Sequence, residues 1–180
     1  KRYFLHMFKF KNKTITQGDR LYNKILFLSR NNIFYTKFCL TDSFQNRIIL
    51  IFFHISFILI NLKINNISQN YKKFSQSVFD LTFKKIEENM RELGYGDVSV
   101  NQNMKFLIKT FYNILLECEN YKKISTKRRR TFLFKYLTPN TNINDDVNDD
   151  IVEYFNKYQA FCFDLNLDSV LSGDLNFKYN

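Results

Sequence analysis

The chain has 180 residues, of which 45% are hydrophobic and 18% aromatic, a composition that excludes a disordered protein and allows one domain with its own core. The formal net charge of +10 suits an anionic partner such as RNA or a lipid surface, although the abundance of lysine, asparagine, isoleucine and phenylalanine is also typical of an AT-rich genome. Two histidines and three widely separated cysteines (Cys39, Cys118 and Cys162) exclude a histidine-rich metal site and a C-x-x-C pair, so we expect no metal and no cofactor.

The first 17 residues begin "KRYFLHMFKFKNK" and contain no acidic residue. They lack the long apolar core and the small-residue cleavage site of a secretory signal. We expect a flexible basic segment at 1–17, with a short amphipathic piece on an anionic membrane as the alternative. Residues 18–180 should form a single compact all-α domain.

The stretch "RLYNKILFLSR" (20–30) has apolar residues at helical spacing, and residues 31–41 predict an irregular or one-turn piece. The most apolar stretch is "RIILIFFHISFILINL" (47–62), whose uninterrupted runs are short for a membrane span. His54 near its middle would be costly in lipid, so we expect a buried core helix, although the β-branched content would also permit a strand. The preceding "DSFQ", which starts at Asp42, matches a capping box.

Residues 65–93 form the longest periodic stretch, with apolar residues mainly three and four apart. Ser68 is the expected N-cap of this helix. Lys84 and Glu88 are placed for an i,i+4 ion pair on its exposed face. The pattern therefore predicts a long amphipathic helix.

Two of the four glycines in the chain stand close together in "LGYGDVS" (93–99). Gly94 comes after the end of the helical pattern, where a left-handed residue is wanted, and Gly96 adds a second permissive position. Asp97 and Ser99 can both cap the next helix, and "SVNQ" is itself a capping box. The stretch predicts a tight helix–helix corner, because the phosphate-binding fingerprints need more glycines and a preceding strand.

The C-terminal third begins with "KKISTKRRRTFLFKYLTP" (122–139), a basic and then apolar stretch that ends at a proline. The next stretch, "NTNINDDVNDD" (140–150), predicts a polar loop whose aspartates favour the start of a helix at 151–162. This loop lacks the ligand order and the glycine of a calcium-binding EF-hand. A last helical turn that stops at Gly173 and an extended end complete the prediction.

The order of these motifs resembles the ubiquinol–cytochrome c chaperone family, assembly factors of the respiratory cytochrome b complex. "LYNKILFLSRNNIFYTKF" (21–38) is similar to the family pattern L-Y-x-x-I-V-x-x-A-R-x-x-x-F-Y, and "DSFQNRIILIFFHISFIL" (42–59) to D-x-x-x-G-R-F-D-x-x-x-L-H-x-F-L. The most specific stretch is "LTFKKIEENMRELGYGDVSVNQNMKFLIKTFY" (81–112), which resembles a run ending M-D-x-x-L-R-E-M-G-V-G-D-L-x-V-x-x-x-M-K-x-x-x-x-x-F-Y. "FLFKYL" (132–137) and "GDLNF" (173–177) fit weaker C-terminal features of the family.

The chain departs from the family pattern at two places. Where the family pattern has a glycine before the arginine, this chain has Asn46 before Arg47. Where the family has Phe-Asp after the arginine, this chain has Ile48-Ile49, so any role of the family's aspartate does not carry over. Matching positions are held by Arg47, His54, Glu87, Arg91, Glu92, Gly94, Gly96 and Asp97.

Each of the polar candidate residues can have a purely structural role or a more specific one. His54 on an apolar helix is expected to be a satisfied core group, the alternative being a polar link to Asp80 or Glu87 on a neighbouring helix. Those two carboxylates are seven residues apart and share a helix face. Nothing beside them activates a nucleophile, so the pair does not indicate acid–base catalysis.

The charged residues around the predicted corner offer a second cluster. Arg91 and its neighbour Glu92 form either a solvated pair or part of a larger arrangement. In the second case Arg91, Asp97 and Arg47 would together brace the corner, because a buried charge there would need a partner.

The resemblance implies a function. The protein would bind newly made cytochrome b at or near the ribosome and hold it for haem insertion and for assembly of ubiquinol–cytochrome c reductase; mitochondrial relatives work with a small partner protein. The location would be the bacterial cytoplasm, peripheral to the inner membrane, or the matrix side in a mitochondrion. Surplus aromatic residues would offer an apolar groove to a transmembrane segment. The residues expected to dock on rRNA or anionic lipid are Lys127, Arg128, Arg129 and Arg130.

Two other classes of function stay open on the sequence. A basic helical RNA- or membrane-surface binding module would bind in a salt-sensitive way without selectivity for cytochrome b. An enzyme would require a cleft with convergent polar groups and a perturbed pKa, for which the sequence offers no basis. We therefore expect a protein that is not an enzyme.

Overall fold

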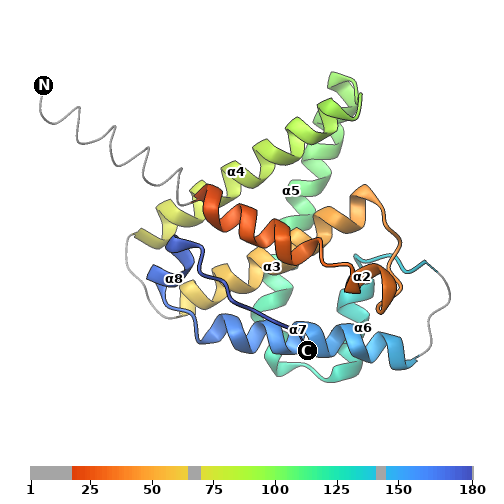
Figure 1. The fold of residues 1–180 in the computed structure, drawn as a ribbon. Coiled ribbons are helices and arrows are strands. Elements are labelled where there is room, and N and C mark those ends of the chain that lie inside the picture. Colours follow the sequence, from red (N-terminus) through yellow and green to blue (C-terminus); the bar gives the residue numbers. More distant parts are fainter. Residues whose placement is uncertain (1–17, 65–69, 141–144, 180) are drawn as a thin grey trace, which may run out of the picture.

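The computed structural model describes residues 18–64, 70–140 and 145–179. Within these ranges helices are the regular elements, joined by turns and short irregular segments, and one isolated antiparallel bridge links Leu40 and Pro139 (Figure 1). In chain order the helices are residues 18–29, α2 (Ile33–Thr36), α3 (Phe44–Ile64), α4 (Asn70–Glu92), α5 (Asp97–Glu119), the 3-10 turn η1 (Tyr121–Lys123), α6 (Thr126–Phe134), α7 (Asp145–Phe163) and α8 (Leu167–Ser172). The expected all-α domain is confirmed.

Helix α3 is the centre of the core, and the other long helices pack around it (Figure 1). By length and composition it could cross a membrane, since it has 21 residues and an 18-residue window with a mean hydropathy of 2.0. The fold instead buries 83% of that window, as expected for a helix that is apolar all round and lies inside a protein. The prediction of a buried helix is confirmed, but the expectation that the stretch is too short to span was wrong.

The abundant phenylalanines are used to join α3 to its neighbours. Phe52 contacts the rings of Phe83 on α4 and Phe111 on α5, at centroid distances of 5.5 and 5.2 Å. On another side of α3, Phe53 contacts Phe132 of α6 and Phe155 of α7, at 5.3 and 5.2 Å. Edge and tilted ring contacts of this kind add specific geometry to the area that the rings bury.

Helices α4 and α5 form an antiparallel hairpin whose tip stands out from the rest of the molecule (Figure 1). The tip is the predicted corner, and Gly94 has the expected left-handed backbone with φ +86°. The Tyr95 N–H donates to the Met90 carbonyl and the Gly94 N–H to the Arg91 carbonyl, which is the hydrogen-bond pattern of a Schellman motif. Gly96 is extended, with φ −70° and ψ 159°, so it does not need the freedom of glycine there.

This difference between the two glycines yields a matched prediction. Gly94→Ala should lower the free energy of unfolding by about 1 kcal/mol, because a Cβ is strained in the left-handed region. Gly96→Ala should cost clearly less, because any residue adopts its backbone and no atom lies within 4 Å of the added Cβ, so only the weaker preference for alanine at this N-cap remains. Urea unfolding of both variants measures this, and equal costs at the two positions would contradict the assigned corner geometry.

Both predicted capping boxes are wrong. At the start of α3 the Ser43 Oγ accepts the Asn46 N–H at 3.2 Å, because the Asp42 carboxylate is taken by an arginine side chain. At the start of α5 the N-cap is Gly96, and Ser99 already lies inside the helix. The Schellman motif leads the chain directly into α5 at Asp97, whose negative charge suits a helix N-terminus.

Most other expected elements are found. The one-turn piece is α2, the Lys84–Glu88 pair forms at 3.9 Å, and Gly173 ends α8 with φ +76°. Helix α7 begins at Asp145, six residues before the predicted start, so part of the acidic loop is its first turns. The segment 1–17 and the proposed N-cap Ser68 lie outside the described residues.

Candidate functional site

An open groove of about 230 Å³ lies between the 18–29 helix, the start of α3 and the end of α4. We call it the α3/α4 groove. Its apolar wall consists of Tyr22, Leu26, Phe44, Ile48, Ile51, Ile86 and Leu93, and its polar rim of Ser29, Arg30, Arg47, Asn89 and Glu92. The volume is below that of typical cofactor and drug pockets and suits one or two side chains of a protein partner.

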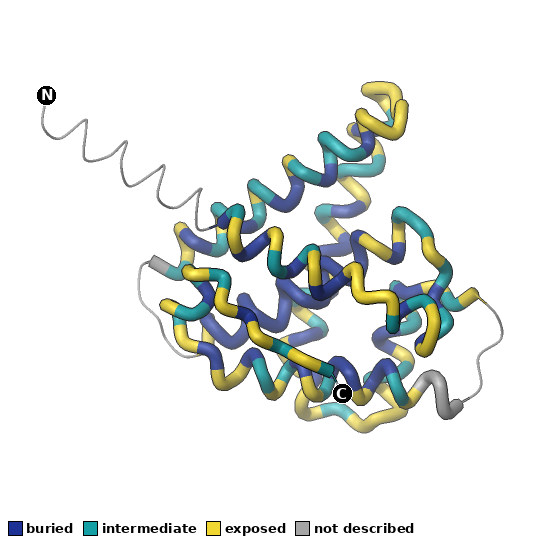
Figure 2. Tube along the Cα trace, viewed as in Figure 1, coloured by how far each residue is buried: buried dark blue, intermediate teal, exposed yellow. Residues whose placement is uncertain are grey.

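Apolar side chains continue from the groove onto the corner at residues 93–99. Leu93 is 61% exposed, Tyr95 40% and Val98 72%, and the ring of Tyr95 lies 6.4 Å from that of Phe44 at the groove. Figure 2 shows the tip of the hairpin as one of the most exposed parts of the chain. Soluble proteins rarely gather large apolar residues at a projecting tip unless the tip contacts something.

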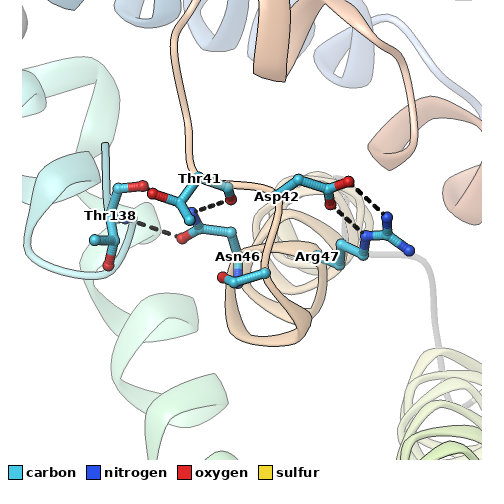
Figure 3. Close-up of polar contacts among 6 residues, drawn as sticks. Thr41, Asp42, Asn46, Arg47 and Thr138 are labelled. Atoms are coloured by element: carbon cyan, nitrogen blue, oxygen red, sulfur yellow. Dashed lines mark hydrogen bonds and ion pairs between the residues drawn. The ribbon is translucent and has the colours of Figure 1, made fainter. Parts of the chain in front are cut away.

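The start of α3, and with it one wall of the groove, is held in place by Asn46 (Figure 3). Its side-chain amide donates to the carbonyls of Thr41 and Thr138, both at 2.7 Å, and its oxygen accepts the Thr138 N–H at 2.9 Å. Asn46 is fully buried. One side chain therefore ties the first turn of α3 to the segment after α6, beside the bridge between Leu40 and Pro139.

Arg47 points away from this clamp and pairs with Asp42 (Figure 3). The guanidinium donates twice, from Nε at 2.7 Å and from Nη2 at 2.8 Å, to the two carboxylate oxygens. This bidentate hydrogen bonding lowers the pKa of Asp42 from its ordinary value. Arg47 thus sits at the groove rim with its charge neutralised in an exposed pair, and it does not join the corner cluster that the sequence suggested.

The corner has its own ion pairs. Arg91, in the last turn of α4, donates to Glu87 at 2.9 Å and to Asp97 in the first turn of α5. These hydrogen bonds raise the pKa of Arg91. The predicted brace therefore exists between Arg91 and Asp97, but it is exposed and lacks Arg47, which pairs with Asp42 instead. Asp80 lies further along α4 and accepts from Gln76 at 2.7 Å.

His54 is fully buried and is a satisfied core group, not a link to Asp80 or Glu87. Its Nδ1 lies 2.6 Å from the Leu50 carbonyl, which can only accept, so Nδ1 carries the proton. Its Nε2 is then the acceptor of the Tyr154 hydroxyl at 2.8 Å. Helix α7, and not α4, supplies the partner, because His54 faces α7 across the core.

The basic cluster divides into two halves. Lys127 and Arg128 are exposed at the start of α6. Arg129 is used inside the protein: it donates to the carbonyls of Tyr121 and Lys122 and to the Asn156 side chain. Arg130 pairs with Asp149 of α7. Neutralising the three arginines together would therefore disturb the fold, and docking on an anion can rely only on Lys127 and Arg128 of the four.

Sequence reasoning found the rim residues Arg47 and Glu92 but missed the groove itself. Its walls come from three helices that are separated along the chain, and periodicity marks Leu26, Ile48 and Ile86 only as core. The one available signal was at the corner, where Leu93, Tyr95 and Val98 are apolar residues in a tight turn. Among the described residues no cluster of three or more His, Cys, Asp or Glu side chains could hold a metal ion.

Comparisons with known proteins indicate the fold and the family of the chain. A search of curated proteins finds no match for the sequence. The crystal structure of the Cbp3 homolog from Brucella abortus matches the fold with a TM-score of 0.79 and 21% identity, over 98% of this chain and 97% of that one. The family model of the ubiquinol–cytochrome C chaperones matches residues 36–177. The chain belongs to the ubiquinol–cytochrome c chaperone family.

Proposed function

We propose that this protein promotes assembly of ubiquinol–cytochrome c reductase by holding newly made cytochrome b, and that the client contacts the α3/α4 groove and the adjoining corner. Membership of the chaperone family supports the assembly role. The observation that carries the binding surface is the apolar wall of the groove, which continues into exposed Leu93, Tyr95 and Val98.

The groove suits a transmembrane segment that is waiting for its cofactors. An apolar helix presents side chains every three or four residues, and one of these can enter the groove while its neighbours rest on the corner. Burying one leucine-sized side chain stabilises such a complex by about 1.5–3 kcal/mol. A few contacts of this size hold a client against aggregation and still permit its release, so the protein acts by stoichiometric binding and not by turnover.

A client of this kind is made at a membrane. We therefore propose a peripheral location at the cytoplasmic side of the inner membrane in a bacterium, or at the matrix side in a mitochondrion. The corner lies at the projecting tip of the α4–α5 hairpin (Figure 1), and the groove adjoins it through Leu93, which leaves the opposite end of α5 free for attachment.

Two equally exposed leucines provide a matched test. Leu93 and Leu116 are each 61% exposed, but Leu93 lines the groove and Leu116 lies near the far end of α5. With an affinity tag on the protein in growing cells, Leu93→Ser should reduce the copurified cytochrome b several-fold, whereas Leu116→Ser should retain it. Equal retention by both variants would exclude the groove as the client site, and absence of cytochrome b from the wild-type sample would contradict the proposed client.

A further inference from the structure

The end of the molecule opposite the corner carries exposed cations and exposed apolar side chains together. We call it the basic end and define it by Ile64, Lys122, Lys123, Lys127, Arg128 and Phe163. Helix α5 runs from the corner to η1 (Figure 1), and its 23 residues place the two ends about 35 Å apart. The basic end is therefore remote from the α3/α4 groove.

Contacts between the elements bring these residues to one end of the fold. Arg129, which follows Lys127 and Arg128 at the start of α6, donates to the Lys122 carbonyl at 3.0 Å, so the start of α6 adjoins η1. The Lys122 Nζ lies 5.1 Å from the centre of the Phe163 ring, so η1 reaches the end of α7. The Asn61 side chain donates to the Leu165 carbonyl at 3.1 Å, which holds the last turn of α3 beside the same end of α7. Ile64 and Phe163 are 59% and 50% exposed. Two large apolar side chains thus project from this end.

The charges around them are mainly positive. Within the described residues, no ion pair joins Lys122, Lys123, Lys127 or Arg128 to a carboxylate. The nearby acids of α5 are already engaged, since Glu119 binds Lys63 and Glu117 binds Lys135, both at 2.6 Å. Asp164 adjoins Phe163 and offsets one charge, so the described part of this end keeps a net positive charge.

We propose that the basic end docks on an anionic phospholipid surface, with Phe163 and Ile64 entering the headgroup region and the four cations meeting lipid phosphates. The Lys122 ammonium lies over the face of the Phe163 ring, so a cation and a large apolar side chain stand together at this end, as anionic headgroups and the apolar layer beneath them require. RNA would use the cations but would leave the aliphatic Ile64 without a partner, so the membrane is the better fit. The proposal rests on the peripheral location proposed above and assigns the surface responsible for it.

A single tryptophan tests the insertion, because the chain contains none. In the full-length protein Phe163→Trp should shift its fluorescence to shorter wavelength on addition of vesicles of phosphatidylcholine and phosphatidylglycerol, but not of phosphatidylcholine alone. Phe106→Trp is the control, since Phe106 is 54% exposed but lies on the corner half of α5. No shift at position 163, an equal shift at position 106, or a shift without anionic lipid would each overturn the proposal.

The cations are tested separately with the exposed set Lys123→Gln, Lys127→Gln and Arg128→Gln, which leaves the internally bonded Arg129 intact. Affinity for the anionic vesicles should fall on the order of tenfold or more, and the wild-type affinity should weaken with salt. Neutralising Lys72, Lys105 and Lys109 is the control of equal charge. A triple variant that loses binding to a ribosomal RNA fragment but keeps its vesicle affinity would identify a nucleic-acid surface instead. Copurification of cytochrome b is measured independently, so a failure here is distinguishable from a failure of the proposed client.

Discussion

Asn46→Ala should cost this protein about 3 kcal/mol of unfolding free energy, one of the largest effects of any single polar substitution. The change deletes two hydrogen bonds of 2.7 Å and one of 2.9 Å from a fully buried side chain. It leaves the Thr138 N–H without its acceptor and removes one donor each from the carbonyls of Thr41 and Thr138. A buried polar group without a partner costs about 1–3 kcal/mol, more than the bond itself contributes.

The neighbouring Gln45 provides the control, because it lies on the same first turn of α3 and is exposed. Gln45→Ala should change the free energy of unfolding by less than about 0.5 kcal/mol. Asn46→Asp should be at least as destabilising as Asn46→Ala, since its carboxylate faces two carbonyl oxygens. Chemical unfolding monitored by circular dichroism measures all three, and an Asn46→Ala protein as stable as Gln45→Ala would show that the clamp does not hold α3.

His54 should make the protein lose stability in weak acid. Burial lowers the pKa of His54 from 6.5 to about 4, so the folded ring stays neutral over a range in which the unfolded ring is protonated. The unfolded state then binds more protons, and stability falls as the pH drops from about 6.5 towards 4. The full loss is about 3 kcal/mol, and it is absent above the unfolded pKa.

Two substitutions separate this effect from the titration of surface carboxylates. His54→Gln removes the titrating group and should flatten the difference in stability between pH 7 and pH 4.5 relative to wild type. Tyr154→Phe removes the hydroxyl that bonds Nε2 but keeps the buried imidazole, so the pH dependence should remain although the protein is less stable. If His54→Gln and wild type lost the same stability between these pH values, His54 would not be the sensor.

Local features of this fold could be predicted from the sequence, and contacts between distant segments could not. Helical spacing and the left-handed Gly94 depend on neighbouring residues, so the existence of the long helices and the position of the corner were predicted correctly, although the start of α7 was placed six residues too late. The partner of Asn46 is 92 residues away and that of His54 is 100 residues away, and no periodic pattern indicates either. The sequence also could not show how the basic cluster is used, because only the fold shows that the Arg129 guanidinium donates hydrogen bonds to the carbonyls of η1.

The capping errors have a similar cause. A capping box is defined by residue types at a fixed spacing, and "DSFQ" satisfies it. The Asp42 side chain nevertheless binds Arg47, because a bidentate pair with a guanidinium is stronger than one bond to a helix N–H. Ser43 is free to accept the N–H instead. Where two acceptors compete for one role, the local pattern alone does not decide between them.

The assembly role is tested most directly by deleting the protein in its own organism and measuring assembled ubiquinol–cytochrome c reductase on native gels, together with cytochrome b mRNA. We expect the assembled complex to be depleted while the mRNA remains at its normal level. Wild-type protein and Leu116→Ser should restore the complex, whereas Leu93→Ser should restore it poorly. A deletion strain with normal amounts of the assembled complex would contradict the proposed function.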